Sequence, residues 1–130
     1  MIGNILVLLV GCHFVGDYWV QTHWQATHKH LPTWTGRRAC ATHVSTYTAF
    51  MGAIVVVVAH SQHLTITPGR LALGLAVSAV THYAADRRAP LRRLALAAGK
   101  DPGWLDGGGL ALLDQAWHMG WLMVAGLVMA

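Results

Sequence analysis

Three pairs of histidine and aspartate stand four residues apart in the sequence. The pairs are His13 with Asp17, His82 with Asp86, and Asp114 with His118. In an α-helix, this spacing brings the two side chains to one face, one turn apart. Imidazole nitrogens and carboxylate oxygens bind divalent ions such as zinc, manganese, iron and nickel. If the three helices lie side by side, the pairs predict a metal site between them.

A fourth segment adds one more histidine to this set, with a tyrosine one helical turn further along. These residues are His43 and Tyr47. The predicted metal ligands are then seven: His13, Asp17, His43, His82, Asp86, Asp114 and His118. Because seven ligands exceed the need of one tetrahedral ion, two interpretations stay open. Either two ions about 3.5–4 Å apart share a bridging carboxylate, or one ion is bound by histidines that the aspartates orient.

The candidate ligands lie in apolar segments that are long enough to form membrane-spanning helices. The 130 residues are 55% hydrophobic and only 11% charged, far from the composition of soluble domains. The apolar residues concentrate at 2–24, 41–60, 71–86 and 110–130, the third segment being short. A bilayer core needs about 20 helical residues, and only helices satisfy the backbone of such segments in lipid. We therefore predict an all-α fold: one integral membrane domain, 1–130, built as a four-helix transmembrane bundle.

The basic residues predict the orientation of this bundle. All but one lie between the first and second segments or between the third and fourth: Lys29, Arg37, Arg38, Arg87, Arg88, Arg92, Arg93 and Lys100, with Arg70 as the exception. Under the positive-inside rule, both basic loops face the cytoplasm and both termini face outward (N-out/C-out), in a bacterial inner membrane. This distribution explains the net charge of +4 without a nucleic-acid partner. We also expect no removable signal peptide, because no basic residue precedes the first apolar segment.

This orientation aligns the histidine and aspartate residues in two layers. The first and third segments run toward the cytoplasm and read His then Asp, whereas the fourth runs away from it and reads Asp then His. Each aspartate is therefore expected one turn nearer the cytoplasm than its histidine. A single pair is more often a polar contact between helices. Three charged aspartates, each opposed by roughly 2.5–3.5 kcal/mol in a membrane span, favour a bound ion instead.

The two basic loops differ in their expected structure. The 23–39 loop is polar and is expected to be irregular. In the second loop, Pro90 is positioned to begin a short amphipathic helix in the headgroup layer, although an ordinary basic loop fits the sequence equally well. The three glycines at 107–109 precede the fourth segment. Because no Lys-Ser or Lys-Thr follows them, they indicate flexible backbone and not a phosphate-binding loop.

Taken together, the motifs resemble the signature of domain-of-unknown-function family 3307, small membrane proteins of bacteria and their phages. The matching residues cover all four segments: His13-x-x-x-Asp17-Tyr18-x-x-Gln21, His43-x-x-x-Tyr47, His82-x-x-x-Asp86 and Asp114-Gln115-x-x-His118. The chain is more distantly similar to membrane-bound proteins labelled metal-dependent hydrolases, which also place His and Asp in short spans. This resemblance implies a hydrolase. The chain is short for such proteins and contains no Glu, which leaves the aspartates as the candidate general bases.

The leading hypothesis is a metal-dependent hydrolase that opens to the cytoplasm and acts on an anionic phosphoester or lipid, which the basic loops would attract. The expected direct ligands are His13, His82 and His118, with Asp86 or Asp114. Asp17 is expected to be the general base or a bridging ligand. His43 and Tyr47 are expected to orient these groups or to stabilise developing charge.

Three other functions stay open at this point. The first is a divalent-ion binding or transport module, although ligands confined to one half of the membrane favour a site over a path. The second is a haem-binding bundle with two axial histidines, which would need no adjacent aspartates. The third is a non-enzymatic phage or bacterial membrane protein. The sequence leaves open the substrate, the metal and whether the chain forms a homo-oligomer.

Overall fold

Helices account for most of the chain. The computed structural model describes residues 2–130, and these residues contain no β-strand. The elements in chain order are α1 (Ile2–Val15), the π-helical turn η1 (Gly16–Val20), α2 (His23–His28), α3 (Trp34–Ser61), α4 (Pro68–Asp86), α5 (Ala89–Ala97), α6 (Pro102–Trp104), the π-helical turn η2 (Leu105–Gly109) and α7 (Leu110–Met129). The predicted all-α class is therefore confirmed.

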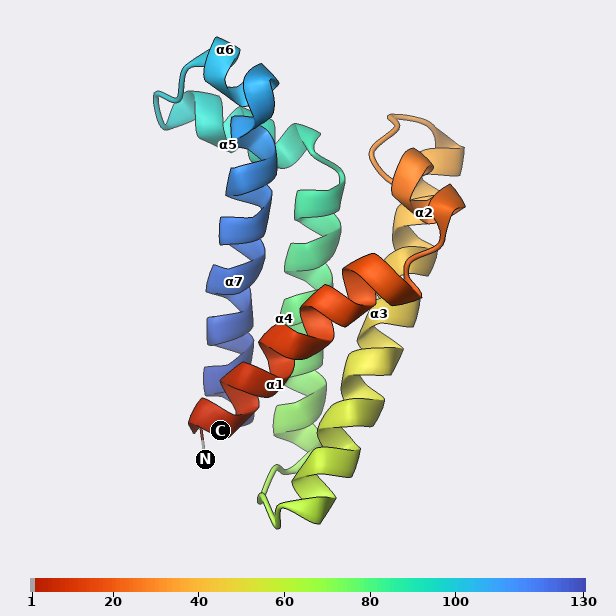
Figure 1. The fold of residues 1–130 in the computed structure, drawn as a ribbon, viewed down its shortest axis with the longest axis vertical. Coiled ribbons are helices and arrows are strands. Elements are labelled where there is room, and N and C mark those ends of the chain that lie inside the picture. The colour runs from red at the N-terminus through yellow and green to blue at the C-terminus, as the bar shows by residue number, and fades with distance from the viewer. Residues whose placement is uncertain (1) are drawn as a thin grey trace.

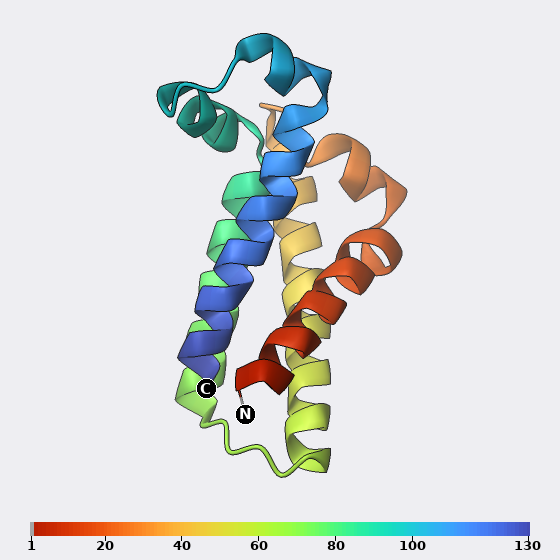
Figure 2. The same cartoon turned by 60° about the vertical axis from the view of Figure 1, so that its left-hand side comes forward.

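Four long helices form an elongated bundle with short helices at one end (Figure 1). α3, α4 and α7 run along the long axis, and α1 crosses them obliquely. α2, α5 and α6 lie at one end, whereas both termini and the connection between α3 and α4 lie toward the other, as the turned view also shows (Figure 2). Both basic loops thus lie at the same end of the bundle.

The long helices differ in how apolar they are. Two helical stretches, Ile2–Val20 and Trp34–Ser61, are long and apolar enough to cross a membrane. α4 and α7 have 19 and 20 residues, but each carries a histidine and an aspartate of the candidate site, which lower its hydropathy. The four-helix transmembrane bundle therefore stays a prediction.

The first basic loop is more ordered than predicted. The first helical stretch ends at Val20 instead of 24. Thr22 then begins α2 through a capping box: its side chain accepts from the Gln25 N–H, and the Gln25 side chain accepts from the Thr22 N–H. The side chain of Thr33 caps α3, which begins earlier than predicted. The expectation of an irregular 23–39 loop was wrong, because these two threonines start helices in it.

The second basic loop contains the predicted short helix. α5 begins next to Pro90 and lies across the end of the bundle (Figures 1 and 2). Leu91 and Ala95 are buried on its inner face, while Leu94 is exposed. Further along, η2 includes Gly108, which has a φ of 113°. That left-handed backbone favours glycine and lets the chain turn into α7.

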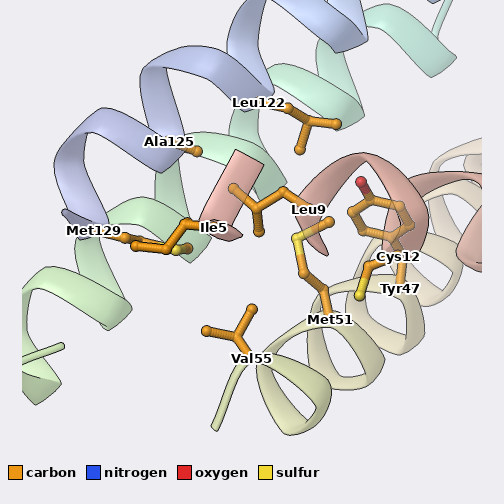
Figure 3. Close-up of a cluster of buried hydrophobic side chains, with 9 residues drawn as sticks. All are labelled: Ile5, Leu9, Cys12, Tyr47, Met51, Val55, Leu122, Ala125 and Met129. Carbon is orange, nitrogen blue, oxygen red and sulfur yellow. The ribbon is translucent and has the colours of Figure 1, made fainter. Parts of the chain in front are cut away.

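An apolar cluster joins α1, α3 and α7 (Figure 3). It contains Ile5, Leu9, Cys12, Tyr47, Met51, Val55, Leu122, Ala125 and Met129. α4 approaches this cluster through its backbone, since a Cβ on Gly74 would lie 2.5 Å from Met129 Cγ and 3.0 Å from the carbonyl oxygen of Ala125. Close approach through glycine is typical of helix contacts in membranes. The cluster lies toward the termini, and the polar residues lie beyond it, toward α2 and α5.

Candidate metal centre

All seven predicted ligands lie close together inside the bundle. Their nitrogen and oxygen atoms form three groups, each with atoms within 4.8 Å of one another: His13, Asp17 and His82; His43, His82 and Asp86; and Asp86, Asp114 and His118. His82 and Asp86 each belong to two groups, so α4 is central to the arrangement. The four long helical stretches thus bring together the residues that the sequence singled out.

Helix spacing and one close helix contact produce this convergence. His82 and Asp86 are one turn apart on α4, and both are buried. Asp17 lies in η1, at the end of the first helical stretch. Gly16 lets η1 approach α3 closely, since a Cβ there would lie 2.5 Å from Tyr47 Cδ2. A larger residue at this position would push Asp17 away from α3 and α4.

Four side-chain atoms from η1, α3 and α4 converge. His43 Nε2 lies 3.0 Å from His82 Nε2. It also lies 3.2 Å from Asp17 Oδ1 and 3.4 Å from Asp86 Oδ2. His82 Nε2 lies 3.4 Å from Asp17 Oδ1 and 3.1 Å from Asp86 Oδ2. We call these four atoms the four-atom set.

Five of the six distances within the four-atom set match those expected around a tetrahedral divalent ion. Zinc bonds to nitrogen and oxygen are about 2.0–2.1 Å long, and a regular tetrahedron with such bonds has edges of about 3.3–3.4 Å. The five distances of 3.0–3.4 Å are close to those edges. Within residues 2–130, Asp17 Oδ1 and Asp86 Oδ2 are buried without a hydrogen-bond partner, which is unfavourable for carboxylate oxygens unless a cation is bound. The residues present therefore fit an ion held by the two imidazoles together with the carboxylate of Asp17 or of Asp86.

His43 was predicted both as one of the seven ligands and as a group that orients others. The structure places its Nε2 in the four-atom set, next to three candidate ligand atoms. His13, expected as a direct ligand, lies outside the four-atom set but belongs to the group with Asp17 and His82. Its Nδ1 lies 3.2 Å from Tyr47 Oη, and its Nε2 lies 3.5 Å from Gln115 Oε1 and 3.7 Å from Asp17 Oδ2. Tyr47 thus orients His13, because its hydroxyl lies one turn deeper on α3 than His43 and reaches α1.

The rings of His13, His82 and His118 lie next to one another as a layer. The His118 ring centroid is 4.8 Å from that of His13 and 4.4 Å from that of His82. His118 Nδ1 donates to the carbonyl oxygen of Asp114 at 2.7 Å. Its Nε2 is left with no hydrogen-bond partner in the described part of the chain and is free to bind an ion. His118, Asp114 and Asp86 therefore offer a second ion position that shares Asp86.

Lys29 is a part of the centre that the sequence analysis missed. Its Nζ lies 2.7 Å from Asp86 Oδ1, so the two oxygens of Asp86 face different partners. Arg87 fixes the backbone beside this lysine by donating to the carbonyl oxygens of Lys29 and Leu31, at 2.7 Å each. No local spacing could have revealed this role, because the turn after α2 meets α4 only in the folded chain.

A cavity of about 420 Å³ extends from the centre toward α5 and η2. Carboxylates and cations both line it: Asp17, Asp86, Asp114, Lys29 and Arg88. Leu91 of α5 and Gly108 of η2 line its other end. With Asp106, which also lines it, the cavity has four carboxylates and two basic side chains, of which Lys29 is paired with Asp86.

The other histidines do not belong to any of the three groups: His23, His28, His30, His60 and His63. His28 and His30 stand on either side of Lys29 in the sequence. Burial, followed by the charges of Arg88 and Arg87, lowers the pKa of His30. This histidine therefore stays neutral at pH 7 and adds no charge to the basic end.

Comparisons with known proteins do not bear on this centre. No family model, curated protein or solved structure matches the chain. The resemblance to family 3307 and to membrane-bound hydrolases therefore stays a prediction, and the geometry of the centre is the basis for a function.

Proposed function

We propose that this chain is an integral membrane metal-dependent hydrolase that acts on an anionic substrate from the cytoplasmic side. The four-atom set is the observation that supports a metal site, because five of its six distances are close to the edges of a tetrahedral site. Nitrogen and oxygen ligands without a thiolate suit zinc, manganese, iron or nickel. The group of Asp86, Asp114 and His118 adds a position for a second ion, so we expect one or two ions per chain.

The distribution of polar and apolar residues supports four membrane-spanning helices. Histidines and Asp86 are buried inside the bundle, whereas each long helix exposes large apolar side chains. Examples that are more than half exposed are Val7 on α1, Val56 and Val57 on α3, Leu73 and Val80 on α4, and Leu112, Met123 and Leu127 on α7. Soluble proteins rarely expose apolar surface on this scale. A bilayer would cover it, and α4 and α7 would keep their polar residues inside.

The charges around the cavity support hydrolysis. A bound divalent ion supplies a Lewis acid and lowers the pKa of water. Asp114 lies outside the four-atom set, lines the cavity and is only partly buried. When no second ion is bound there, its carboxylate can accept a proton from an attacking water. Arg88 lines the same cavity and can hold an anionic group beside the centre. Asp17, the base expected from the sequence, is better suited to be a ligand because its Oδ1 belongs to the four-atom set.

The packing of the bundle favours a hydrolase over an ion carrier. The candidate ligands lie within one small volume, and the apolar cluster that includes Ile5, Met51 and Met129 lies between them and the termini. An ion path through the bundle would need polar groups on that side as well. Ion transport is therefore the result that would contradict the hydrolase in the turnover assay below.

Metal content tests the first half of the proposal. The parent protein, purified in detergent, should contain about one or two divalent ions per chain by elemental analysis. His82→Ala should lose most of this metal, because His82 belongs to two of the three groups. His60→Ala, near the opposite end of α3, is the matched control and should keep it. Equal metal content in the two variants would mean adventitious binding.

Turnover tests the second half. The metal-loaded parent should hydrolyse at least one member of a panel of phosphomonoesters, phosphodiesters and phospholipids, and a chelator should abolish this activity. A protein that keeps its metal, hydrolyses nothing in the panel and moves divalent ions into liposomes would be an ion carrier. That result would overturn the hydrolase and retain the metal centre.

A further inference from the structure

Two hollows meet beside α5, one polar and one apolar. The polar one is the cavity of about 420 Å³ next to the centre. The apolar one is a groove of about 250 Å³ between α5 and α7, whose lining includes Leu91, Leu94, Ala95, Leu113, Ala116 and Trp117. Leu91 lines both hollows. The two hollows thus lie on either side of Leu91, and an elongated molecule that passes this side chain would place a polar end in the cavity and an apolar end in the groove.

The cavity offers a positive charge that no carboxylate of residues 2–130 pairs with. Arg88 lines it, whereas the neighbouring Arg92 is paired with Asp106 at 2.8 Å. The backbone of Arg88 has a φ of 55°, in the left-handed region that residues other than glycine rarely adopt. Strained residues of this kind cluster at functional sites. Arg88 can bind the anionic group of a ligand above the centre.

The groove has the features of a site for a hydrocarbon chain. Its lining is apolar except at Lys100. Trp117 Nε1 donates to the carbonyl oxygen of Thr81 at 3.0 Å, which holds the indole ring in place as part of the lining. Ala116 is small and exposed, and it keeps the groove open. α5, which forms the other side, lies across the end of the bundle, where the head groups of a membrane would be (Figures 1 and 2).

We propose that the substrate is an anionic phospholipid, with its head group in the cavity and one acyl chain in the groove. This inference rests on the proposed hydrolase and deepens it. The place of Leu91 in the lining of both hollows and the match between a phosphate and the charge of Arg88 carry the inference. A water-soluble phosphoester would fill only the cavity and leave the groove without an occupant.

The reaction would be hydrolysis of a phosphate ester. The oxygen of a water bonds to phosphorus, and the bond between phosphorus and the leaving alcohol oxygen breaks. Asp114 takes a proton from the water and returns it to the leaving oxygen. Water is the only co-reactant, and no oxidant or reductant is needed.

The groove would align the lipid more than it would attract it. Acyl chains are as apolar as the groove, so transfer of one chain from the bilayer gains little free energy. The groove instead fixes where the head group lies, which holds the ester beside Asp114 and the four-atom set. Preference for an anionic over a zwitterionic lipid would come from Arg88. The two roles can therefore be tested by separate variants.

Fluorescence quenching of Trp117 tests the binding mode without any turnover. The protein is placed in phosphatidylcholine vesicles that contain a small, increasing fraction of phosphatidylglycerol brominated on its acyl chains. We expect saturable quenching that Trp117→Phe removes and that brominated phosphatidylcholine does not produce at the same fraction. Arg88→Gln should weaken the preference for the anionic lipid by about fivefold, the usual effect of one basic residue at a membrane surface.

Variants of the groove test where the acyl chain lies. Ala116→Phe, or the smaller change Ala116→Leu, should remove the saturable quenching and keep the metal content of the parent. Ala72→Phe is the matched control, since Ala72 is also exposed but does not line the groove, and it should behave as the parent. In hydrolysis assays, the Ala116 variants should slow turnover of phosphatidylglycerol by at least about tenfold and leave that of soluble glycerol phosphate esters unchanged.

The outcomes separate this inference from the proposed function. Equal, non-saturating quenching by both lipids in the parent and in the Ala116 variants would show that Trp117 meets only bulk lipid, and would overturn the lipid site. If soluble esters are hydrolysed and the groove variants change the turnover of no substrate, the lipid site is overturned and the hydrolase is retained. Saturable lipid binding without turnover of any ester would retain the lipid site and overturn the hydrolase.

Discussion

The contacts of individual ring nitrogens distinguish the histidines of the centre. Both nitrogens of His13 face polar groups, those of Tyr47 and Gln115. His43 instead directs Nε2 toward two carboxylates and His82. The spacing in the sequence cannot distinguish the roles of these histidines, because it predicts only that each lies on an inward-facing side of its helix. Their roles follow from geometry that spacing does not encode.

We predict that His43→Ala lowers metal affinity more than His13→Ala does. Loss of a residue next to the ligands usually lowers metal affinity by about 10–100-fold, which is the expected effect for His13→Ala. Loss of a direct ligand at His43 should exceed that range. Competition with a chromogenic chelator measures both affinities. The reverse order would restore His13 as the direct ligand.

A second prediction concerns the proton acceptor. Asp114→Asn should keep the ion of the four-atom set and lower turnover by roughly 10²–10⁴-fold, the usual contribution of a positioned base. Asp106→Asn is the matched control, because Asp106 lines the same cavity but is paired with Arg92, and it should change turnover little. Elemental analysis and rate measurements on the same preparations check both parts. Complete loss of metal in Asp114→Asn would show that Asp114 is an essential ligand.

At the scale of elements, α4 depends on its glycine for close packing. A Cβ on Gly74 would meet the side chain of Met129 at 2.5 Å and the backbone of Ala125 at 3.0 Å. We predict that Gly74→Ala destabilises the bundle by about 1–3 kcal/mol, as overpacking does. Gly120→Ala should be neutral or stabilising by up to about 1 kcal/mol, since Gly120 has open space around it. Unfolding by denaturant in mixed micelles compares the two, and equal stability would mean that the helices shift apart freely.

Elements with their own pattern could be predicted, and those that depend on distant contacts could not. The long apolar segments predicted α3, α4 and α7, and Pro90 predicted the start of α5. The α2 helix was missed because a capping box at Thr22 starts it within a polar stretch that has no helical periodicity. Convergence of the ligands followed from the spacing of His and Asp. The contact between Lys29 and Asp86 could not be predicted from spacing, because it depends on how the turn after α2 meets the end of α4.

The whole molecule places its basic loops at one end and its termini at the other. If the chain spans a membrane in the predicted orientation, the connection at 62–67 and both termini face outward. Single cysteines introduced there should react with an impermeant reagent on intact cells, whereas cysteines introduced at 29–33 and 98–101 should be protected. The native Cys12 and Cys40 are buried and should be replaced by alanine first. Labelling of 98–101 from outside would reverse the orientation.

The ion pair between Lys29 and Asp86 bears on the order in which the protein matures. Asp86 is buried, and the chain itself supplies an ammonium group 2.7 Å from one of its oxygens. The bundle can therefore assemble with this carboxylate already neutralised, and the ion can arrive afterwards. We predict that chelation leaves the helical content of the parent unchanged by circular dichroism.

The variant Lys29→Met should make folding depend on the ion. Without metal, its Asp86 would be buried without a cation, which typically destabilises a protein by about 3–5 kcal/mol. Added metal should restore most of that stability, because an ion that binds only the folded chain stabilises it. Denaturant titrations of parent and variant, with and without metal, measure the difference. If the metal-free variant is as stable as the metal-free parent, Lys29 does not stand in for the ion. If the variant is less stable, the chain carries in its own sequence the charge that neutralises Asp86 before any ion binds.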